Sequence, residues 1–313
     1  MTEGYQALRE GAAIVDLNGR GKIRVTGQDR ARLLHAMTTN SVVELGPGRG
    51  CYAFFLNAQG RILADARILC FEDHFLLDTE PETAAKVMAH LDKYIIADDV
   101  TLEDATSEFV TIGVEGPGAA ELLQSLGAAL PAERHAFLEW GSRWVVHSDS
   151  TGAGGYWLLA PAAEKDAILA HLQAEGAVPA DAEDARTVRL EHGRPRYGEE
   201  FGEAQIPQET QLMHAVHFSK GCYLGQEIVE RVRSRGHVNR LLVQLRLPAG
   251  AKVAAGTELT ADGKPAGEIA SAAVSPALGQ VVALGYVRVA YAKAGIRLAA
   301  GGVTAEVSAV RPG

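Results

Sequence analysis

The sequence is poor in cysteine, and what it lacks excludes several classes of protein. Among 313 residues only three are cysteines, Cys51, Cys70 and Cys222, and none of them forms a CxxC pair. This small odd set argues against a disulfide framework, a zinc site or a complete protein-bound iron–sulfur cluster. No apolar run approaches the roughly 20 residues that cross a bilayer. The first residues show neither a basic nor an apolar leader region, so we expect no signal peptide and a cytoplasmic location.

Positive charge is also scarce. The net charge is −9, which predicts that the chain as a whole repels nucleic acid. The segment 220–240 is a local exception, because its basic residues outnumber its acidic ones. It carries Lys220, Arg231, Arg233, Arg235 and Arg240 against Glu227 and Glu230. A solvated helix face and an anion site explain this segment equally well, and the sequence leaves both open.

The composition is that of a globular protein with an ample core. Apolar residues make up 47% of the chain and charged residues 22%, and the length suggests two or three domains. Alternating residues predict a hairpin from 51–57 and 61–70, joined by Asn57-Ala58-Gln59-Gly60. In its second strand one face is apolar, whereas the other carries Asp65 and Arg67.

Elsewhere in the first 240 residues, predicted helices and strands alternate, and after residue 240 the pattern changes. We expect helices after Asp29, from about 81 to 95, and at 118–126, 162–175 and 181–192, with strands at 22–25, 110–114, 143–147 and 156–159. The last part contains short β-rich pieces at 241–247, 258–260, 267–272, 281–287 and 303–310. They predict a small antiparallel barrel or sandwich and a domain boundary near residue 240.

The most specific stretch is residues 220–227, Lys-Gly-Cys-Tyr-Leu-Gly-Gln-Glu. Its two glycines allow tight turns, and a predicted helix follows its cysteine. Lys220 and the positive end of that helix would both favour the thiolate form of Cys222. A lone cysteine is otherwise more often a small buried apolar side chain than a nucleophile. The neighbours of Cys222 favour the reactive interpretation.

This octapeptide matches, without departure, the signature Lys-Gly-Cys-Tyr-x-Gly-Gln-Glu. The chain thereby resembles the YgfZ-type folate-binding proteins, which are relatives of the glycine-cleavage T protein, an aminomethyltransferase. Further similar blocks cover most of residues 14–240, whereas the β-rich tail is similar in character only. These blocks lie at 16–27, 39–40, 50–57, 189–200 and 207–210.

The resemblance implies an α+β fold of the aminomethyltransferase (GcvT) type. In that fold, mixed α/β domains surround a central hole that takes up tetrahydrofolate, and a small C-terminal β-barrel follows. Residues 1–240 would then form two interleaved α/β subdomains, and residues 241–313 the antiparallel barrel.

The resemblance also assigns site residues. Asp65 falls where the T protein has its catalytic carboxylate, Glu191 where the family has an acid that binds the pterin, and Tyr52 where a tyrosine lines the folate pocket. Tyr223 of the signature is assigned to the same pocket. The anionic glutamate tail of tetrahydrofolate, or of a one-carbon derivative, would suit Arg194, Arg196 or the arginines of 231–240.

The chemistry of the residue types agrees with these roles but leaves an alternative open. A carboxylate can accept two adjacent N–H donors of a pterin ring, and a tyrosine offers a flat apolar wall with a polar tip. The alternative is that Asp65 and Glu191 are simple ion-pair partners, of Arg67 in the first case and of Arg189 or Arg194 in the second.

Three positions depart from the T-protein pattern. Ala64 replaces the first of two adjacent aspartates, Ser41 follows Thr-Asn where the family usually has aspartate, and the loop at 150–155 keeps only glycines of a longer motif. Aminomethyl transfer relies on a carboxylate placed at the folate nitrogen, so these changes weaken the prediction of that activity. They leave folate binding intact as a prediction.

The function that the resemblance implies is a folate-dependent factor for the assembly or repair of iron–sulfur enzymes, radical enzymes that modify transfer RNA among them. Cys222, with its thiolate stabilised by Lys220, would exchange with a partner, ligate iron transiently or undergo redox chemistry at the mouth of the cleft. Its partners would be folate and iron–sulfur assembly proteins or client enzymes, with no direct nucleic-acid or membrane binding and no resident metal. Two alternatives stay open: a folate-dependent aminomethyltransferase or one-carbon transferase that depends on Asp65, and a non-catalytic scaffold.

Overall fold

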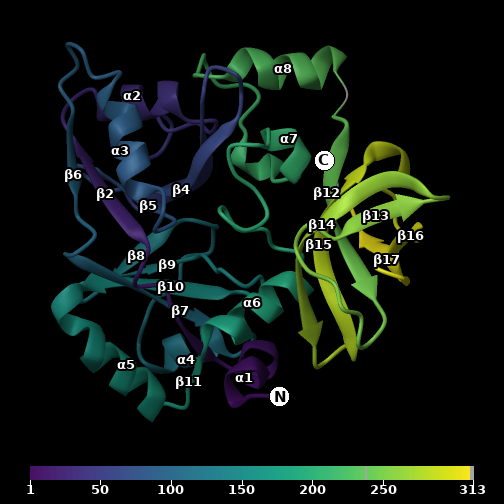
Figure 1. The fold of residues 1–313 in the computed structure, drawn as a ribbon. Helices are drawn as coiled ribbons and strands as arrows, with labels where there is room; N and C mark the ends of the chain where they lie inside the picture. Colours follow the sequence, from purple (N-terminus) through teal and green to yellow (C-terminus); the bar gives the residue numbers. More distant parts are fainter. Residues whose placement is uncertain (237, 311–313) are drawn as a thin grey trace.

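The computed structural model of the chain describes residues 1–236 and 238–310, apart from the side chain of Arg235, as two β-sheets with covering helices and a barrel (Figure 1). The five-stranded sheet has the order β3-β4-β5-β2-β6. Its strands are β2 (Gly21–Thr26), β3 (Arg49–Leu56), β4 (Ile62–Cys70), β5 (Phe75–Thr79) and β6 (Thr101–Asp104). Helices α2 (Arg30–Met37) and α3 (Ala84–Asp92) pack on one face through residues such as Leu34 and Leu91.

Side-chain alternation along β3 and β4 divides the residues of this sheet between two environments. Ala64, Ala66 and Ile68 belong to the core beneath the two helices. Asp65 and Arg67 therefore point to the opposite face, which becomes a wall of the site described below. The predicted polar face of the hairpin thus lines the candidate site.

The six-stranded sheet has the order β11-β1-β7-β10-β9-β8. Its strands are β1 (Ala13–Asp16), β7 (Phe109–Glu115), β8 (Phe137–Trp140), β9 (Arg143–Val146), β10 (Gly155–Pro161) and β11 (Val178–Ala180). One face packs on α4 (Ala119–Ser125) and α5 (Lys165–Ala174), and α1 (Glu3–Glu10) and α6 (Ala182–Glu191) pack around β1 and β11. The chain begins this sheet with β1, leaves it to build the five-stranded sheet, and returns with β7.

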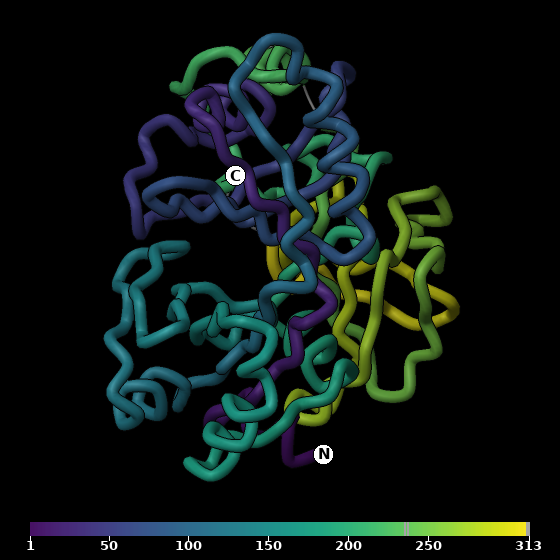
Figure 2. Tube along the Cα trace, turned by 90° about the vertical axis from the view of Figure 1, so that its left-hand side faces the viewer, coloured from purple at the N-terminus to yellow at the C-terminus, as the bar shows by residue number. Residues whose placement is uncertain are grey.

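The C-terminal strands close into a barrel of order β12-β15-β14-β13-β16-β17 around an apolar core. They are β12 (Arg240–Leu247), β13 (Glu258–Ala261), β14 (Lys264–Ser275), β15 (Gln280–Arg288), β16 (Arg297–Ala300) and β17 (Val303–Ala309). The barrel packs against α6 through β14 and β15. Figure 2 shows it beside the parts built on the five-stranded and six-stranded sheets, which are stacked one above the other. The expected α+β fold with a C-terminal antiparallel barrel is confirmed.

Two short helices connect the barrel to the rest of the chain, α7 (Pro207–Thr210) and α8 (Gln226–Arg235). Single 3-10 turns lie at Ala162–Glu164, Met213–Ala215 and Val289–Tyr291. Sequence reasoning missed eight short elements, α1, α7, β1, β5, β6, β8, β11 and β16. No helix in the described part of the chain is both long and apolar enough to cross a membrane.

Candidate functional site

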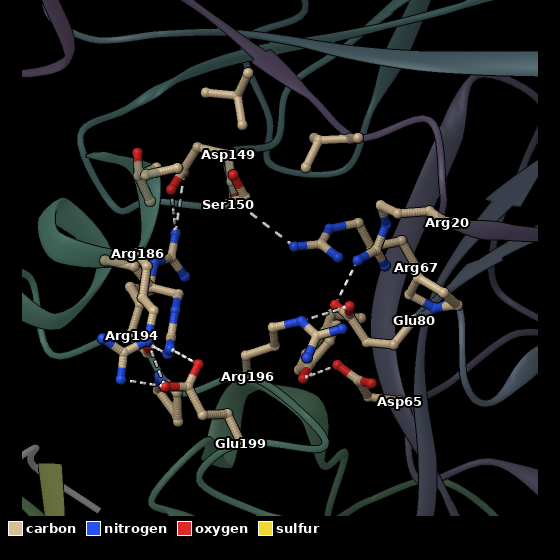
Figure 3. Close-up of a pocket in the computed structure, with 18 of the residues that line it drawn as sticks. Arg20, Asp65, Arg67, Glu80, Asp149, Ser150, Arg186, Arg194, Arg196 and Glu199 are labelled. Carbon is tan, nitrogen blue, oxygen red and sulfur yellow. Dashed lines mark hydrogen bonds and ion pairs between the residues drawn. The ribbon is translucent and has the colours of Figure 1, made fainter. Parts of the chain in front are cut away.

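A cavity of about 410 Å³, here called the central cavity, lies where both sheets and the segment after α6 meet (Figure 3). Its walls are rich in charged side chains from several turns and strands. They include Arg20, Asp65, Arg67, Glu80, Arg134, Asp149, Arg186, Arg189, Arg194, Arg196 and Glu199. Of its described lining residues none belongs to the barrel. The volume suits an organic ligand of cofactor size.

Tyr52 and Asp65 form a buried pair on the wall made by β3 and β4. The Tyr52 hydroxyl donates a hydrogen bond of 2.7 Å to Asp65 Oδ2, and the Tyr52 ring stacks on His214 with 5.5 Å between ring centres. Asp65 Oδ1 is buried and has no hydrogen-bond partner among the described residues. Burial, together with the nearby charge of Glu80, raises the pKa of Asp65 to about 6. The cavity wall thus carries an acceptor whose second oxygen is available to a ligand.

A positive sector lies beside this pair. Arg67 donates to Ser148 Oγ at 2.8 Å and lies 3.9 Å from the centre of the Trp157 ring, and it has no carboxylate within ion-pair distance among the described residues. Burial and the charge of Arg20 lower the pKa of Arg67 to about 10. Asp149 ion-pairs with Arg134 and Arg194, each at 2.8 Å. Two guanidinium groups therefore share one carboxylate, and a third, that of Arg67, has none, so this sector attracts an anion.

The loop that carries Asp149 is held by one fully buried carboxylate, Glu115, at the end of β7. Glu115 accepts hydrogen bonds from the backbone N–H and the hydroxyl of Ser150 and of Thr151, and from Trp157 Nε1. These bonds span 2.6 to 3.1 Å. Burial raises the pKa of Asp149, but the charges of Arg194 and Arg134 outweigh it and lower that pKa to about 2. The loop is therefore fixed and Asp149 stays ionised.

A second cavity, of about 570 Å³, adjoins the first. Both are lined by Tyr52, Arg134, His135, Arg194 and His214. The second cavity also reaches Cys51, whose thiol is buried, which raises its pKa to about 12. A thiol of this kind stays protonated at neutral pH.

The signature segment caps helix α2. The Lys220 ammonium donates to the backbone carbonyls of His35, Thr38 and Asn40, the last two at 2.6 and 2.8 Å. The backbone N–H of Leu224 donates to the carbonyl of Ala36 at 2.9 Å. Carbonyls at a helix C-terminus lack partners within the helix, so the signature satisfies them. Burial lowers the pKa of Lys220 to about 8.

Gly225 of the signature is required by the close approach of the β3–β4 hairpin. It has φ of +83°, and a Cβ atom at this position would lie 2.6 Å from the carbonyl oxygen of Asn57. Any other residue would combine a clash with backbone and a strained conformation. The signature is thereby joined to the strands that carry Tyr52 and Asp65.

Cys222 is exposed in the loop between Lys220 and α8, and it does not line either of the two cavities above. Among the described residues no hydrogen bond joins it to Lys220, because the ammonium faces the α2 carbonyls. The Lys220 ammonium is thus bound to these carbonyls, and the stabilisation of a Cys222 thiolate by Lys220 stays a prediction. A short chain of contacts still links the loop to the cavity, since Asn40 Nδ2 donates to the carbonyls of Tyr52 and His214 at 3.0 and 3.2 Å.

Glu191 and Tyr223, both assigned to the pocket from the sequence, lie elsewhere. The Glu191 carboxylate is buried between α1 and the barrel, where it accepts hydrogen bonds from Tyr5 and Ser275 and pairs with Arg9. Tyr223 packs in an apolar cluster behind Tyr52, with 7% of its surface exposed. Neither side chain lines the central cavity, so we give neither a part in the proposed site.

The arginines near the barrel also lie away from the cavity. Arg240 pairs with Glu209 and Glu268, and Arg233 pairs with Glu230. The side chain of Arg235 lies outside what the structure describes. Of the arginines proposed for an anionic tail, Arg194 and Arg196 line the cavity. The simple ion pairs considered as alternatives, Asp65 with Arg67 and Glu191 with Arg189 or Arg194, do not occur among the described side chains.

Several cavity residues were not found from the sequence. Arg20, Glu80, Asp149 and Arg134 come from turns that are distant along the chain, and none lies in a motif with its own chemical meaning. One signal was available: Asp149 follows a predicted strand and precedes a glycine-containing loop, a common position for binding residues.

Comparison with known proteins supplies the family context. Residues 1–220 match the model described as the GCVT N-terminal domain, and residues 240–312 match the glycine cleavage T-protein C-terminal barrel domain. An aminomethyltransferase of Rubrobacter xylanophilus is 30% identical over 290 residues, which cover 90% of this chain and 78% of that protein. A putative chloroplastic transferase of Arabidopsis thaliana is 29% identical over 277 residues, 86% of this chain and 63% of the plant protein.

A solved structure agrees in fold. The aminomethyltransferase T of the glycine cleavage system from Bartonella henselae superposes with a TM-score of 0.88 and 21% identity, over 98% of this chain and 88% of that one.

Proposed function

The chain belongs to the glycine-cleavage T-protein (GCVT) family, and from that premise we propose that it binds tetrahydrofolate, or a one-carbon derivative, in the central cavity. We further propose that it is a YgfZ-type member, which supports the assembly or repair of iron–sulfur enzymes through Cys222. Radical enzymes that modify transfer RNA are among the proposed clients, and the proposed location is the cytoplasm.

The observation that carries the folate proposal is the Tyr52–Asp65 pair. Asp65 Oδ1 is buried without a partner on the cavity wall, and a carboxylate oxygen of this kind accepts the N–H donors on the pyrimidine edge of a pterin. Tyr52 and His214, already stacked on one another, add flat surface for a ring. A pterin bound there would place a folate nitrogen, which can carry a one-carbon unit, inside the central cavity.

The positive sector suits the other end of the ligand. Arg134 and Arg194 share the single carboxylate of Asp149, which leaves positive charge for the carboxylates of a glutamate tail. Both arginines also line the second cavity, so a tail held there has room to extend.

Support for the iron–sulfur role comes from the signature and from the exposure of Cys222. An exposed thiol in a loop that is fixed by the hydrogen bonds of Lys220 and Leu224 can meet a partner protein, where it would exchange, ligate iron transiently or undergo redox chemistry. In this proposal Lys220 holds the loop in place, while the Cys222 thiol reacts with the partner protein. Iron–sulfur assembly proteins or client enzymes are the proposed partners.

A folate-dependent aminomethyltransferase or other one-carbon transferase is the second candidate. It is favoured by the names of the relatives and by the position of Asp65 in the cavity. Ala64 and the shortened motif in the loop at 150–155 count against it.

Tetrahydrofolate binding is tested by calorimetry and by thermal unfolding, since a ligand selective for the folded state must raise its melting temperature. We expect Tyr52→Phe to weaken binding at least several-fold, because it removes the hydroxyl that orients Asp65. Tyr223→Phe is the matched control, since its hydroxyl is buried behind the wall without a hydrogen-bond partner among the described residues, and it should bind as the wild type does. Absence of any thermal shift at saturating tetrahydrofolate would remove the folate proposal.

The iron–sulfur role is tested in a strain that lacks the protein. Cys222→Ser should fail to restore iron–sulfur enzyme activity under oxidative stress, yet bind tetrahydrofolate normally. Full rescue by Cys222→Ser would eliminate the role assigned to the thiol. If Cys222→Ser rescues the strain and the protein releases ammonia from an aminomethyl donor, an activity that Asp65→Asn loses, the transferase would be established instead. Rescue by a variant that cannot bind folate would point to a scaffold.

A further inference from the structure

Arg67 differs from the other arginines in the walls of the central cavity. Seven described arginines line this cavity, and six of them pair with a carboxylate. Among the described side chains Arg67 has no carboxylate within ion-pair distance, although it lines the same cavity. A charged group held away from bulk water is stable only when hydrogen bonds or an opposite charge compensate it. A ligand in the cavity would supply the acceptor that the protein does not.

The guanidinium group of Arg67 is held in one orientation by its surroundings. Its Nε atom donates to Ser148 Oγ at 2.8 Å, and its Nη2 atom donates to the carbonyl of Asp149 at 3.4 Å. One face of the group lies 3.9 Å from the centre of the Trp157 ring, which Glu115 in turn fixes through a hydrogen bond of 3.1 Å. Among the described residues the remaining nitrogen, Nη1, has no hydrogen-bond partner. Arg67 is therefore a preorganised donor with one position left for a ligand.

This donor lies beside the acceptor already described on β4. Asp65 and Arg67 are two residues apart on one strand, so their side chains share a face, with roughly 7 Å between the Cα atoms. Tyr52 contacts both: its hydroxyl donates to Asp65 Oδ2 at 2.7 Å, and its ring centre lies 5.7 Å from Arg67 Cζ, across the paired strands β3 and β4. Figure 3 shows both residues on the same wall of the cavity. This wall thus offers the unpaired Oδ1 acceptor of Asp65 next to the Nη1 donor of Arg67.

Resting on the folate site proposed above, we propose that Arg67 is a specificity-determining residue, which donates to the carbonyl oxygen at C4 of the pterin while Asp65 accepts from the neighbouring N3–H. The pyrimidine edge of a 4-oxo pterin carries this donor and this acceptor side by side, so it matches the wall. In a 4-amino pterin the pattern is reversed, because N3 has no hydrogen and C4 carries an amino group. A donor would then face the charged donor of Arg67, and a lone pair would face Asp65. The pair therefore selects the 4-oxo ring and rejects the 4-amino ring.

The test compares two ligands, tetrahydrofolate and its 4-amino analogue, by calorimetry on the whole chain without oxygen at pH 8. We expect the wild type to bind tetrahydrofolate about 10- to 100-fold more tightly, because the analogue replaces charge-assisted hydrogen bonds with facing groups of the same kind.

Arg67→Met removes the donors and keeps an unbranched side chain. The affinity for tetrahydrofolate should fall about tenfold, and the ratio between the two ligands should fall with it, because only Asp65 is left to tell them apart. A role of Arg67 confined to holding the loop at 148–149 would instead weaken both ligands alike and leave their ratio unchanged.

Arg143→Met is the matched control. The Arg143 guanidinium also lies over a tryptophan ring, with 5.5 Å to the centre of Trp140. It pairs with Glu164 at 2.8 Å, however, and lines neither of the two cavities. This variant should leave both affinities, and hence their ratio, as in the wild type.

Equal affinity of the wild type for the two ligands, or a ratio that Arg67→Met leaves unchanged, overturns the proposal while the folate site stands. Should Arg67→Met not fold, Arg67→Gln, which is polar but uncharged, takes its place with the same expectation. If neither ligand binds the wild type, the folate site and the role of Arg67 fail together.

Discussion

Replacement of Lys220 by methionine separates the two roles that its position in the signature allows. Methionine keeps the length and most of the apolar volume of the side chain but removes the ammonium. In the structure that ammonium donates to three backbone carbonyls at the end of α2. If its purpose is to hold the loop, the variant must lose stability; if its purpose is to activate Cys222, stability should hardly change.

The expected magnitude follows from those contacts. Each lost hydrogen bond costs about 1 kcal/mol net, and more where the carbonyl is left buried without a partner. A cation at a helix C-terminus contributes about 0.5 kcal/mol in addition. Relief from burying a charged group returns on the order of 1 kcal/mol. We therefore expect Lys220→Met to lower the free energy of unfolding by about 2 to 3 kcal/mol, and the melting temperature by roughly 3 to 5 °C for a chain of this length.

Urea unfolding followed by circular dichroism measures this loss, with Cys222→Ala as the matched control. Cys222 lies two residues away and is exposed, so its removal should change stability by no more than about 0.5 kcal/mol. An unchanged urea midpoint for Lys220→Met would refute the structural role and favour activation of the Cys222 thiol as the role of Lys220. The result also bears on function, because only the Cys222 variants test the thiol without disturbing the loop.

Three further changes test the electrostatics of the cavity. In the folded protein the pKa of Asp65 is raised from 3.8 to about 6. The unfolded chain therefore loses this proton first as pH rises, and the stability of the wild type falls between about pH 4 and pH 6. In urea titrations Asp65→Asn should be more stable than the wild type by about 1 to 3 kcal/mol at pH 8 and equal to it at pH 4. Asp149 has its pKa lowered to about 2, so its contribution is complete above pH 4 and lost toward pH 2; Asp149→Asn should cost about 2 kcal/mol at pH 7 and flatten the acid limb of thermal melts. Glu115→Gln places an amide donor against N–H and hydroxyl donors, so it should lower the free energy of unfolding by about 2 to 4 kcal/mol. Calorimetry should also show weaker ligand binding. An unaltered affinity would show that the loop at 148–152 is not needed for the ligand.

Local patterns were sufficient to predict most of the fold. The alternation along 61–70 fixed not only β4 but also which of its faces is polar, because a strand exposes successive residues to opposite sides. The missed elements lack such a signal: β5, Phe-Leu-Leu-Asp-Thr, is buried throughout, and β16 has four residues. The division of the chain near residue 240 and the folate and iron–sulfur roles stay predictions.

The candidate site was predictable only where a residue lies inside a recognisable block. Tyr52, Asp65 and Arg194 were found in this way, and they line one cavity. Glu80 was not, because only the tertiary fold brings the β5–α3 turn against β4. The partners of Lys220 are backbone carbonyls, which carry no sequence signal, so the sequence pointed to its neighbour Cys222 instead. The partners of Glu191 lie in α1 and the barrel, between 84 and 186 residues away along the chain.

The path of the chain between the two sheets bears on the order of folding during synthesis. All strands of the five-stranded sheet lie between residues 21 and 104, so this unit can form as soon as it leaves the ribosome. Strand β1, made earlier, pairs with β7 and β11, and it must wait unpaired until they emerge. Until then its apolar residues Ile14 and Val15 stay exposed on the growing chain, where chaperones can bind them. Slow translation between residues 104 and 180 would lengthen the time for which they are exposed.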